Sequence, residues 1–222
     1  MSTKQQPSVP GSHHVKIVVA LIVSVSLHSV CLAEKNSEMD LLIATRGDAV
    51  FADDFEKGKL SDTWSQIRGE WNVVNGEVVG KELKADKHAA VFHCLKKNRN
   101  SVVKFSFKLN GAEGFHFSLN HRKGHLFRAI VSADSLIVRT DADKRNKSIK
   151  SEVIGTAKGV FNQNKWYTMQ VEMVGDKVAV VTDNGLKVVG QHPRLDTEKP
   201  NYRFILKGEY LVLDDLQVHS AE

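Results

Sequence analysis

Residues 71–80 read WNVVNGEVVG, with an Asn-Gly pair between two short apolar runs. This pair is a strong signal for a two-residue β-hairpin, because both central turn positions need a positive φ. Apolar and polar residues alternate again at 103–109 (VKFSFKL) and at 115–119 (FHFSL). A period of two gives a strand one buried face and one solvent face. The three segments therefore predict a hairpin and two further strands.

The rest of the chain continues this pattern in short runs separated by turn residues. Further strands are expected at 126–131, 136–140, 166–174, 178–182, 186–189, 202–206 and 211–218. No stretch of twelve or more residues shows an apolar stripe with a helical period. About ten to thirteen short strands indicate a sandwich or a barrel. We predict one all-β domain over residues 48–220, preceded by a polar linker at 34–47.

A basic and then apolar segment opens the chain. Lys4 and Lys16 stand before an uncharged apolar segment at 17–27, and small side chains follow up to Ala33. This order is typical of a secretory signal peptide cleaved after Ala33. The segment is too short for a hydrocarbon core of about 30 Å, which needs about 20 apolar residues. We expect residues 1–33 to be removed, leaving a secreted or periplasmic protein with no transmembrane segment.

The two cysteines argue against a lipid anchor and against a disulfide. A lipoprotein signal has a small residue before its cysteine, whereas Val30 precedes Cys31, so lipid anchoring there is disfavoured. Cleavage after Ala33 leaves Cys94 as the single cysteine, and no intramolecular disulfide can form. The apolar neighbours of Cys94 predict a buried, inert thiol, so stability must come from the core.

The charge balance excludes one class of partner. The chain carries 31 basic and 26 acidic residues, and loss of the leader removes two lysines and no acids. The remaining 29 basic and 26 acidic residues give no strong overall field. We therefore expect no nucleic-acid partner.

Segments at both ends of the domain together resemble a known superfamily. They are 51–56 (FADDFE), Trp64, 69–80 (GEWNVVNGEVVG), 166–178 (WYTMQVEMVGDKV), 183–185 (DNG) and 213–218 (LDDLQV). Over residues 48–219 the chain resembles the concanavalin A-like, jelly-roll superfamily. It looks most similar to bacterial secreted domains named after 3-keto-disaccharide hydrolase, also described as family 16 glycoside hydrolase-like. The resemblance implies a two-sheet antiparallel jelly-roll sandwich. It does not imply one activity, because lectins, carbohydrate-binding modules and hydrolases share the fold.

The carboxylates argue against family 16 chemistry. A retaining glycosidase needs two carboxylates about 5–5.5 Å apart, and family 16 enzymes carry them as E-x-D-x-E on one strand. The only E-x-D here is Glu38-Met39-Asp40, which lies in the predicted linker and is followed by Leu42. Glu172 stands alone on its strand. Catalysis is left open by the sequence, which favours a binding protein.

Polar residues gather around the predicted hairpin tip after residue 115. The candidate ligand-binding residues are His116, Asn120, His121, His125 and Arg128. His116 and Asn120 share the strand face opposite the phenylalanines, and His125 and Arg128 lie on the returning strand. Such a face suits sugar hydroxyls, which pair with planar donors and acceptors. The alternatives are a solvated hairpin and a histidine metal site.

Four aspartates form a second candidate site. If the first and last strands pair, Asp53 and Asp54 approach Asp214 and Asp215, and calcium takes oxygen ligands of this kind. A structural calcium is therefore possible, and no other cofactor is expected. The alternative is that these side chains face solvent at strand ends.

Aromatic residues offer a third route to sugar recognition. Trp64, Trp71, Trp166 and Tyr167 could each stack on a pyranose ring. A tryptophan at a strand start is more often a core or rim anchor.

Three functions are compatible with the sequence. The favoured one is an exported lectin-like domain that recognises a carbohydrate or polysaccharide. The second is a glycoside hydrolase or lyase acting on 3-keto-glycosides, with His116 or His125 as the base. The third is a structural protein of the cell envelope.

Overall fold

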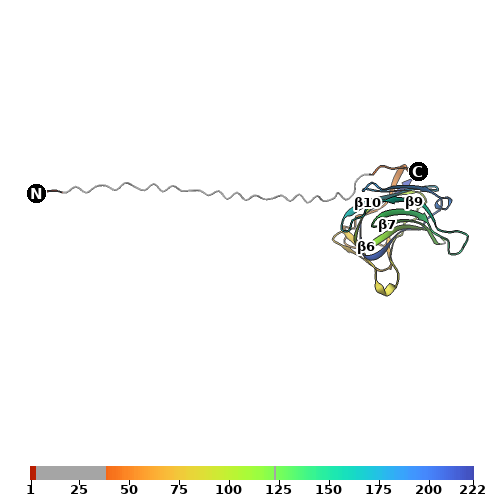
Figure 1. The fold of residues 1–222 in the computed structure, drawn as a ribbon, viewed down its shortest axis with the longest axis horizontal. Coiled ribbons are helices and arrows are strands. Elements are labelled where there is room, and N and C mark those ends of the chain that lie inside the picture. Colours follow the sequence, from red (N-terminus) through yellow and green to blue (C-terminus); the bar gives the residue numbers. More distant parts are fainter. Residues whose placement is uncertain (4–38, 123) are drawn as a thin grey trace. The chain divides into compact units, whose positions relative to one another are not determined.

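A computed structural model describes residues 1–3, 39–122 and 124–222 (Figure 1). Apart from residues 1–3, the predicted signal peptide lies outside the described residues, and so does Cys31. All the strands belong to one compact unit, which extends to Glu222.

The described residues form thirteen strands and two short 3-10 turns, η1 (Lys84–Asp86) and η2 (Pro193–Leu195). The strands are β1 (Arg46–Asp53), β2 (Trp64–Arg68), β3 (Glu70–Val74), β4 (Glu77–Lys81), β5 (Ala90–Cys94), β6 (Ser101–His121), β7 (Gly124–Ser132), β8 (Ser135–Thr140), β9 (Glu152–Lys158), β10 (Trp166–Val174), β11 (Lys177–Thr182), β12 (Lys187–Gln191) and β13 (Tyr202–Ala221). In this part of the chain no helix has the length and apolar character needed to cross a bilayer.

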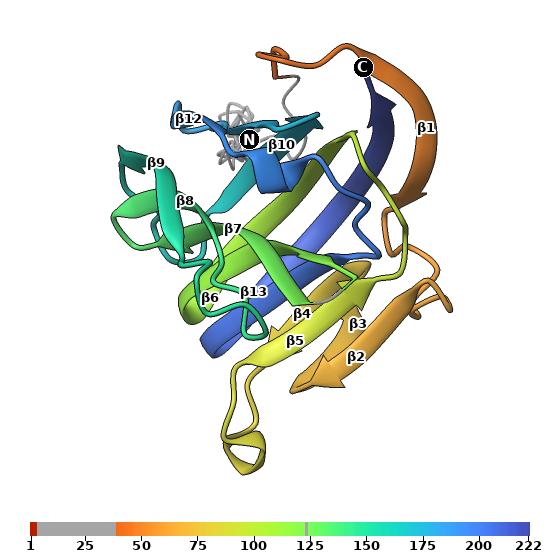
Figure 2. The ribbon, with the colours of Figure 1, turned by 90° about the vertical axis from the view of Figure 1, so that its right-hand side faces the viewer.

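Two long strands, β6 and β13, organise the sandwich. They pair antiparallel along almost their whole length, from Tyr202↔Leu119 to Ser220↔Ser101, and Figure 2 shows them side by side. The first half of β6 also pairs with β10, followed by β11 and β12. Its second half pairs with β7, followed by β8 and β9. The two halves thus belong to opposite layers, and the prediction of a two-sheet, all-β antiparallel sandwich is confirmed.

The passage from one layer to the other occurs at glycines. Gly111 on β6 has φ 84° and Gly208 on β13 has φ 101°. The register between the strands shifts on both sides of Gly208. A Cβ on Gly208 would lie 2.8 Å from the backbone nitrogen of Glu113. Positive φ and close backbone approach both favour glycine, and the resulting bulges let the paired strands bend together.

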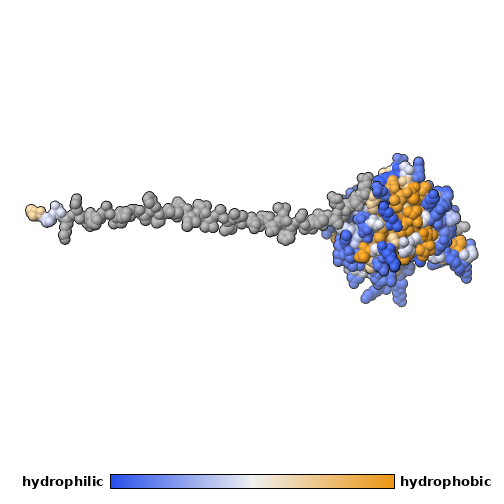
Figure 3. Space-filling view, turned by 45° about the horizontal axis from the view of Figure 1, so that its top comes forward, coloured by the Kyte–Doolittle hydropathy of each residue, from blue (hydrophilic) through white to orange (hydrophobic). Residues whose placement is uncertain are grey.

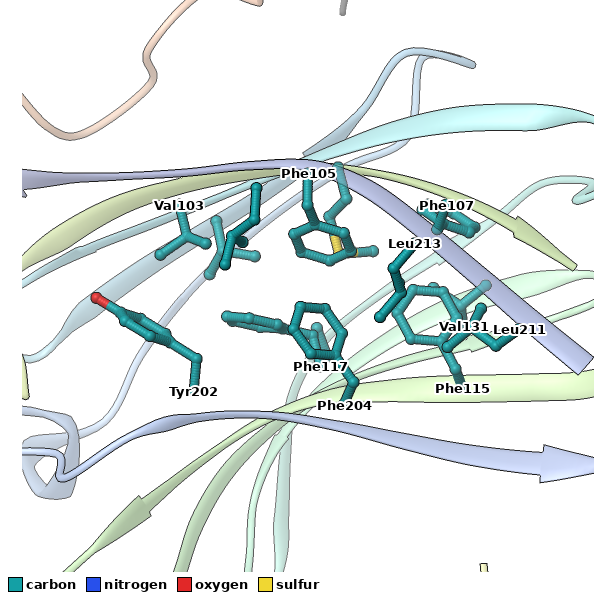
Figure 4. Packing of buried hydrophobic residues seen from close by; sticks show 14 of the residues in the cluster. Val103, Phe105, Phe107, Phe115, Phe117, Val131, Tyr202, Phe204, Leu211 and Leu213 are labelled. Atoms are coloured by element: carbon teal, nitrogen blue, oxygen red, sulfur yellow. The ribbon is translucent and has the colours of Figure 1, made fainter. Parts of the chain in front are cut away.

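The core lies between the layers (Figure 4). The Phe105 ring, from the first half of β6, packs 5.3 Å from the Phe117 ring of the second half and 5.0 Å from the Phe204 ring of β13. The alternation predicted at 103–109 and 115–119 is confirmed on this inner face. The outer face differs from the expectation, because Ser106 and Ser118 are also buried. β6 is a central strand, and its neighbours on both sides cover its small polar residues.

The Asn-Gly hairpin forms as predicted. β3 and β4 pair up to Val74↔Glu77, and Asn75 and Gly76 have φ of 53° and 76°. On the inner face, Trp71 lies over Gly80, where a Cβ would come within 2.3 Å of the indole ring. Gly80 therefore provides the space that the buried indole needs.

Aromatic stacking joins this hairpin to the neighbouring strands. The ring of Phe92 on β5 stacks between Trp64, at 4.6 Å, and Trp71, at 4.8 Å. Both tryptophans and Tyr167 are buried in the core. These three aromatic residues therefore act as core anchors and are not available to stack on a sugar.

The first and last strands pair, as expected if they close a sheet edge. β1 pairs with the end of β13, with Asp53 opposite Leu216. Just before β1, the carboxylate of Glu172 on β10 accepts the backbone N–H groups of Leu42, Ile43 and Ala44 at 2.8–3.0 Å. Residues 42–44, which belong to the predicted linker, are therefore bound to the sandwich. The domain boundary at residue 48 stays a prediction.

The single cysteine of the folded domain is buried. Cys94, at the end of β5, is a free thiol in the core. Burial raises the pKa of this thiol to about 12, so it carries little thiolate at neutral pH. The prediction of a buried thiol is confirmed.

One face of the folded domain carries a group of apolar residues bordered by hydrophilic ones (Figure 3). The exposed large apolar side chains of the domain include Leu42, Val50 and Val189. Apolar atoms form a large share of ordinary protein surfaces, so these side chains do not by themselves mark a binding site.

We predict that Phe92→Ala lowers the free energy of unfolding by about 3–5 kcal/mol, because it leaves a cavity between two indole rings. Urea denaturation followed by tryptophan fluorescence measures the change. Val153→Ala, at an exposed position of β9, is the control and should change stability by less than about 0.5 kcal/mol. Equal effects of the two substitutions would contradict the role of the stack.

Candidate functional site

A row of polar side chains crosses the outer face of the layer formed by β5, β13, β6 and β7. The Cα partners across these strands are His93, Arg203, Ser118 and Arg128, in that order. Arg139 on β8 continues the row beyond Arg128. Each alternates with core residues on its own strand, as Arg203 does with Tyr202 and Phe204. Strand pairing therefore assembles one polar surface from five separate segments.

A hollow of about 240 Å³ lies on this surface. We call it the arginine pocket. Its lining residues are His88, Ala89, His116, His125, Arg128, Arg203, Ile205 and Lys207. Its volume is below the range of pockets for drug-sized ligands. It therefore suits a small group, such as one residue of a longer molecule.

Arg128 has a carboxylate partner. Its Nε donates to Oδ2 of Asp141 at 2.6 Å, and its Nη1 donates to Nδ1 of His116 at 3.1 Å. The buried Asp141 also accepts a hydrogen bond from Arg139 at 3.1 Å. One carboxylate thus serves two guanidinium groups.

Arg203 is held differently. Its Nε donates to Nε2 of His93 at 2.9 Å, and its Nη1 donates to Oδ1 of Asn120 at 2.8 Å. The same Nη1 lies 2.9 Å from Nδ1 of His125. Within residues 39–122 and 124–222, no carboxylate lies within 4.0 Å of Arg203. Its protein partners are therefore neutral acceptors.

The histidines of the site are kept neutral. Burial, and then the nearby Arg203 charge, lowers the pKa of His93 to about 4. Burial and the charge of Arg128 lower the pKa of His116 to about 4 as well. The pKa of His125 is also lowered, first by burial and then by Arg203. At pH 7 these imidazoles are neutral, and each can both accept and donate a hydrogen bond.

Solved structures with a similar fold include several proteins with carbohydrate-related names. The chain superposes on a carbohydrate-binding module, CBM66, from Bacillus subtilis with a TM-score of 0.59 and 14% identity, covering 73% of this chain and 99% of the module. A laminarinase from Rhodothermus marinus gives a TM-score of 0.61 and 11% identity, covering 82% and 100%. A protein of unknown function with a galectin-like fold from Bacillus subtilis gives 0.59 and 13%, covering 81% and 99%.

No family model matches the sequence, and no curated protein matches it. The likeness is therefore one of structure, and it decides the fold. The fold is the concanavalin A-like jelly roll. The fold that the resemblance over residues 48–219 implied is therefore confirmed.

The jelly roll brings together four of the five residues predicted for the ligand site. His116, His125 and Arg128 line the arginine pocket, and Asn120 binds Arg203 at its edge. His121 does not line the pocket, and its Nε2 lies 3.9 Å from Asp143. A role in ligand binding for these residues stays a prediction.

The sequence pattern did not single out Arg203 and Lys207, which line the pocket, or His93, which accepts a hydrogen bond from Arg203. Arg203 stands between apolar residues in the run YRFIL, and His93 stands likewise in VFHC. A charged or polar residue at an alternate position of such a run indicates the outer face of a strand. That signal was present, but it does not reveal which strands are neighbours.

Three of the four aspartates, Asp53, Asp54 and Asp215, line one hollow together with Lys57 and Lys59, and a calcium ion there stays a prediction. Asp53 accepts hydrogen bonds from the backbone N–H of Phe55 and from Nε1 of Trp64, at 3.0 and 2.8 Å. Asp54 accepts the backbone N–H of Glu56. In the described part of the jelly roll, no group of three or more His, Cys, Asp or Glu side chains is placed to share a metal ion. The β1–β13 pairing was predicted correctly. The carboxylate of Asp53 accepts hydrogen bonds within the protein, from the turn at Phe55 and from the indole of Trp64.

We predict that lowering the pH from about 6.5 to about 4 reduces the free energy of unfolding, partly through His93 and His116. Their pKa values are lower in the folded protein than in the unfolded chain, so the unfolded state binds more protons in this window. The loss should be roughly 1–3 kcal/mol in total, allowing for screening by solvent. Urea denaturation at a series of pH values measures it.

The double variant His93→Gln, His116→Gln removes both titrating rings. It should show a shallower dependence of stability on pH, whatever its absolute stability. An unchanged slope would contradict the assignment.

Proposed function

We propose that this chain is an exported carbohydrate-binding protein and that the arginine pocket receives its glycan. The observation that carries the proposal is the set of planar polar groups lining a small hollow on the sheet of a concanavalin A-like jelly roll. The carbohydrate-binding module and the laminarinase among the similar structures support it.

The chemistry of the pocket suits a sugar. The Nδ1 atoms of His116 and His125 face the guanidinium groups of Arg128 and Arg203, so each neutral ring offers its Nε2–H as a donor to a ligand, and the guanidinium groups donate in a fixed plane. Ile205 and Ala89 add apolar surface, which suits the C–H faces of a sugar ring. A few fixed polar groups beside apolar wall atoms are typical of small-molecule sites.

The carboxylates near the pocket favour binding over hydrolysis. No Asp or Glu is among the described residues that line the pocket, and the nearby Asp141 is bound by two arginines. Two carboxylates are the usual requirement for glycoside hydrolysis. His116, with a pKa of about 4, is a weak base for removing a proton from a 3-keto-glycoside.

We predict that the purified protein binds selected glycans on a broad array and that His125→Ala weakens the binding about tenfold or more. Loss of one ligand hydrogen bond in a buried site is worth about 1.5 kcal/mol, which corresponds to that factor. Titration calorimetry with the best array ligand measures the dissociation constant.

His219→Ala is the matched control, because it removes a histidine from the other half of β13, away from the pocket. It should leave the affinity unchanged, and both variants should keep the wild-type melting temperature within a few degrees. Absence of binding to every glycan would overturn the proposed function.

Export is the second part of the proposal. The basic and apolar residues at 1–27 and the small residues up to Ala33 support it. We predict that the full chain, expressed in a bacterium, is recovered outside the cytoplasm with Glu34 as its first residue, as intact mass would report. Ala33→Arg should leave the leader attached, because signal cleavage needs a small residue at this position. A cytoplasmic product that retains residues 1–33 would contradict export.

A further inference from the structure

The arginine pocket contains more positive charge than the protein itself neutralises. Arg203 is only 7% exposed, and within the described residues it has no carboxylate partner. Burying a charge without an opposite charge is costly. Burial accordingly lowers the pKa of Arg203 to about 10, with Arg128 as the next cause and a smaller, opposing effect of Asp141. The guanidinium is still protonated at pH 7, so the pocket holds a buried cation without a directly bonded carboxylate.

The surrounding groups do not supply the missing negative charge. Asp141 is already shared by Arg128 and Arg139, and its backbone carbonyl accepts a hydrogen bond from Arg194. Lys207 lines the pocket as a further cation. Its partner Glu113 forms an ion pair at the exposed rim, where both side chains are more than 60% exposed to solvent. Such a pair contributes little and leaves the interior positive.

Hydrogen-bond donors remain available beside the charge. The bonds of Arg203 and Arg128 use Nε and Nη1 in each case. The second terminal nitrogen, Nη2, of both has no acceptor among the described residues. Ser118 lies between the two arginines in the row, and its buried Oγ has no hydrogen-bond partner in the described part of the chain. The pocket lining thus contains two arginines, each with a terminal nitrogen free to donate. Ser118 lies beneath them and does not line the pocket.

We propose that the sugar recognised by this pocket is acidic, and that its carboxylate or sulfate ester is bound by Arg203 with Arg128 and Lys207. A guanidinium binds such oxyanions through parallel N–H bonds, which are stronger than bonds to neutral oxygens. An anion here supplies the counter-charge that Arg203 lacks. The small hollow admits one acidic sugar residue of a polysaccharide. This inference rests on the proposed function and names the class of its ligand.

The test compares ligands that differ only in charge. Oligogalacturonate and its methyl ester form one pair, and a sulfated galactan oligosaccharide and its desulfated form make the other. We expect one acidic form to bind the purified protein at least tenfold more tightly than its neutral counterpart in titration calorimetry. A preference within the galacturonate pair would identify a carboxylate as the bound group, and a preference within the galactan pair would identify a sulfate ester.

Two variants link the preference to the pocket. Arg203→Gln should abolish the difference between acidic and neutral ligands. If that variant does not fold, Lys207→Gln at the exposed rim should still reduce the difference about two- to fivefold. His219→Ala is again the control and should retain the full preference.

The possible failures are distinguishable. Binding of neutral glycans that equals or exceeds binding of both acidic forms would overturn the acidic ligand and leave the proposed function standing. Binding of free sulfate or acetate as tightly as the oligosaccharides would show an ion site and also overturn it. Absence of binding to any glycan, acidic or neutral, would overturn the proposed function as well.

Discussion

The antiparallel pairing of β6 with β13 is the constraint on which both layers of the sandwich depend. Each strand has one half in each layer, so a shift in their register would move side chains in both sheets at once. A shift by one residue would exchange core and outer faces and bring Ser106 and Ser118 between the layers. The bends at Gly111 and Gly208 keep the two halves paired while the strands change layer.

The same pairing creates the candidate site. When Phe117 and Phe204 face the core, Ser118 and Arg203 must face outward on adjacent strands. Pairing with β5 and β7 then adds His93 and Arg128 to the row. The packing of the phenylalanines between the layers therefore also fixes which polar groups meet on the surface, and a rigid central sheet holds them in place.

The electrostatics of the row distinguish its two central arginines. Arg128 forms an ion pair with Asp141, whereas Arg203 donates its hydrogen bonds to neutral acceptors. Neutral histidines suit this role, because protonated rings would repel the guanidinium groups. The depressed pKa values of His93 and His116 follow from this environment. A buried charge whose direct partners are all neutral is typical of a position where function outweighs stability.

The sequence by itself determined the strands, their inward faces and the Asn-Gly hairpin, because alternation and turn chemistry are local properties of the chain. It also placed His116, Asn120, His125 and Arg128 on one hairpin, because two successive strands are neighbours in most sheets. Only the tertiary structure decided that β13 lies beside β6, and thus that Arg203, bonded to His93, completes the pocket. Contacts between residues about a hundred positions apart depend on the register of non-consecutive strands, which no local pattern encodes.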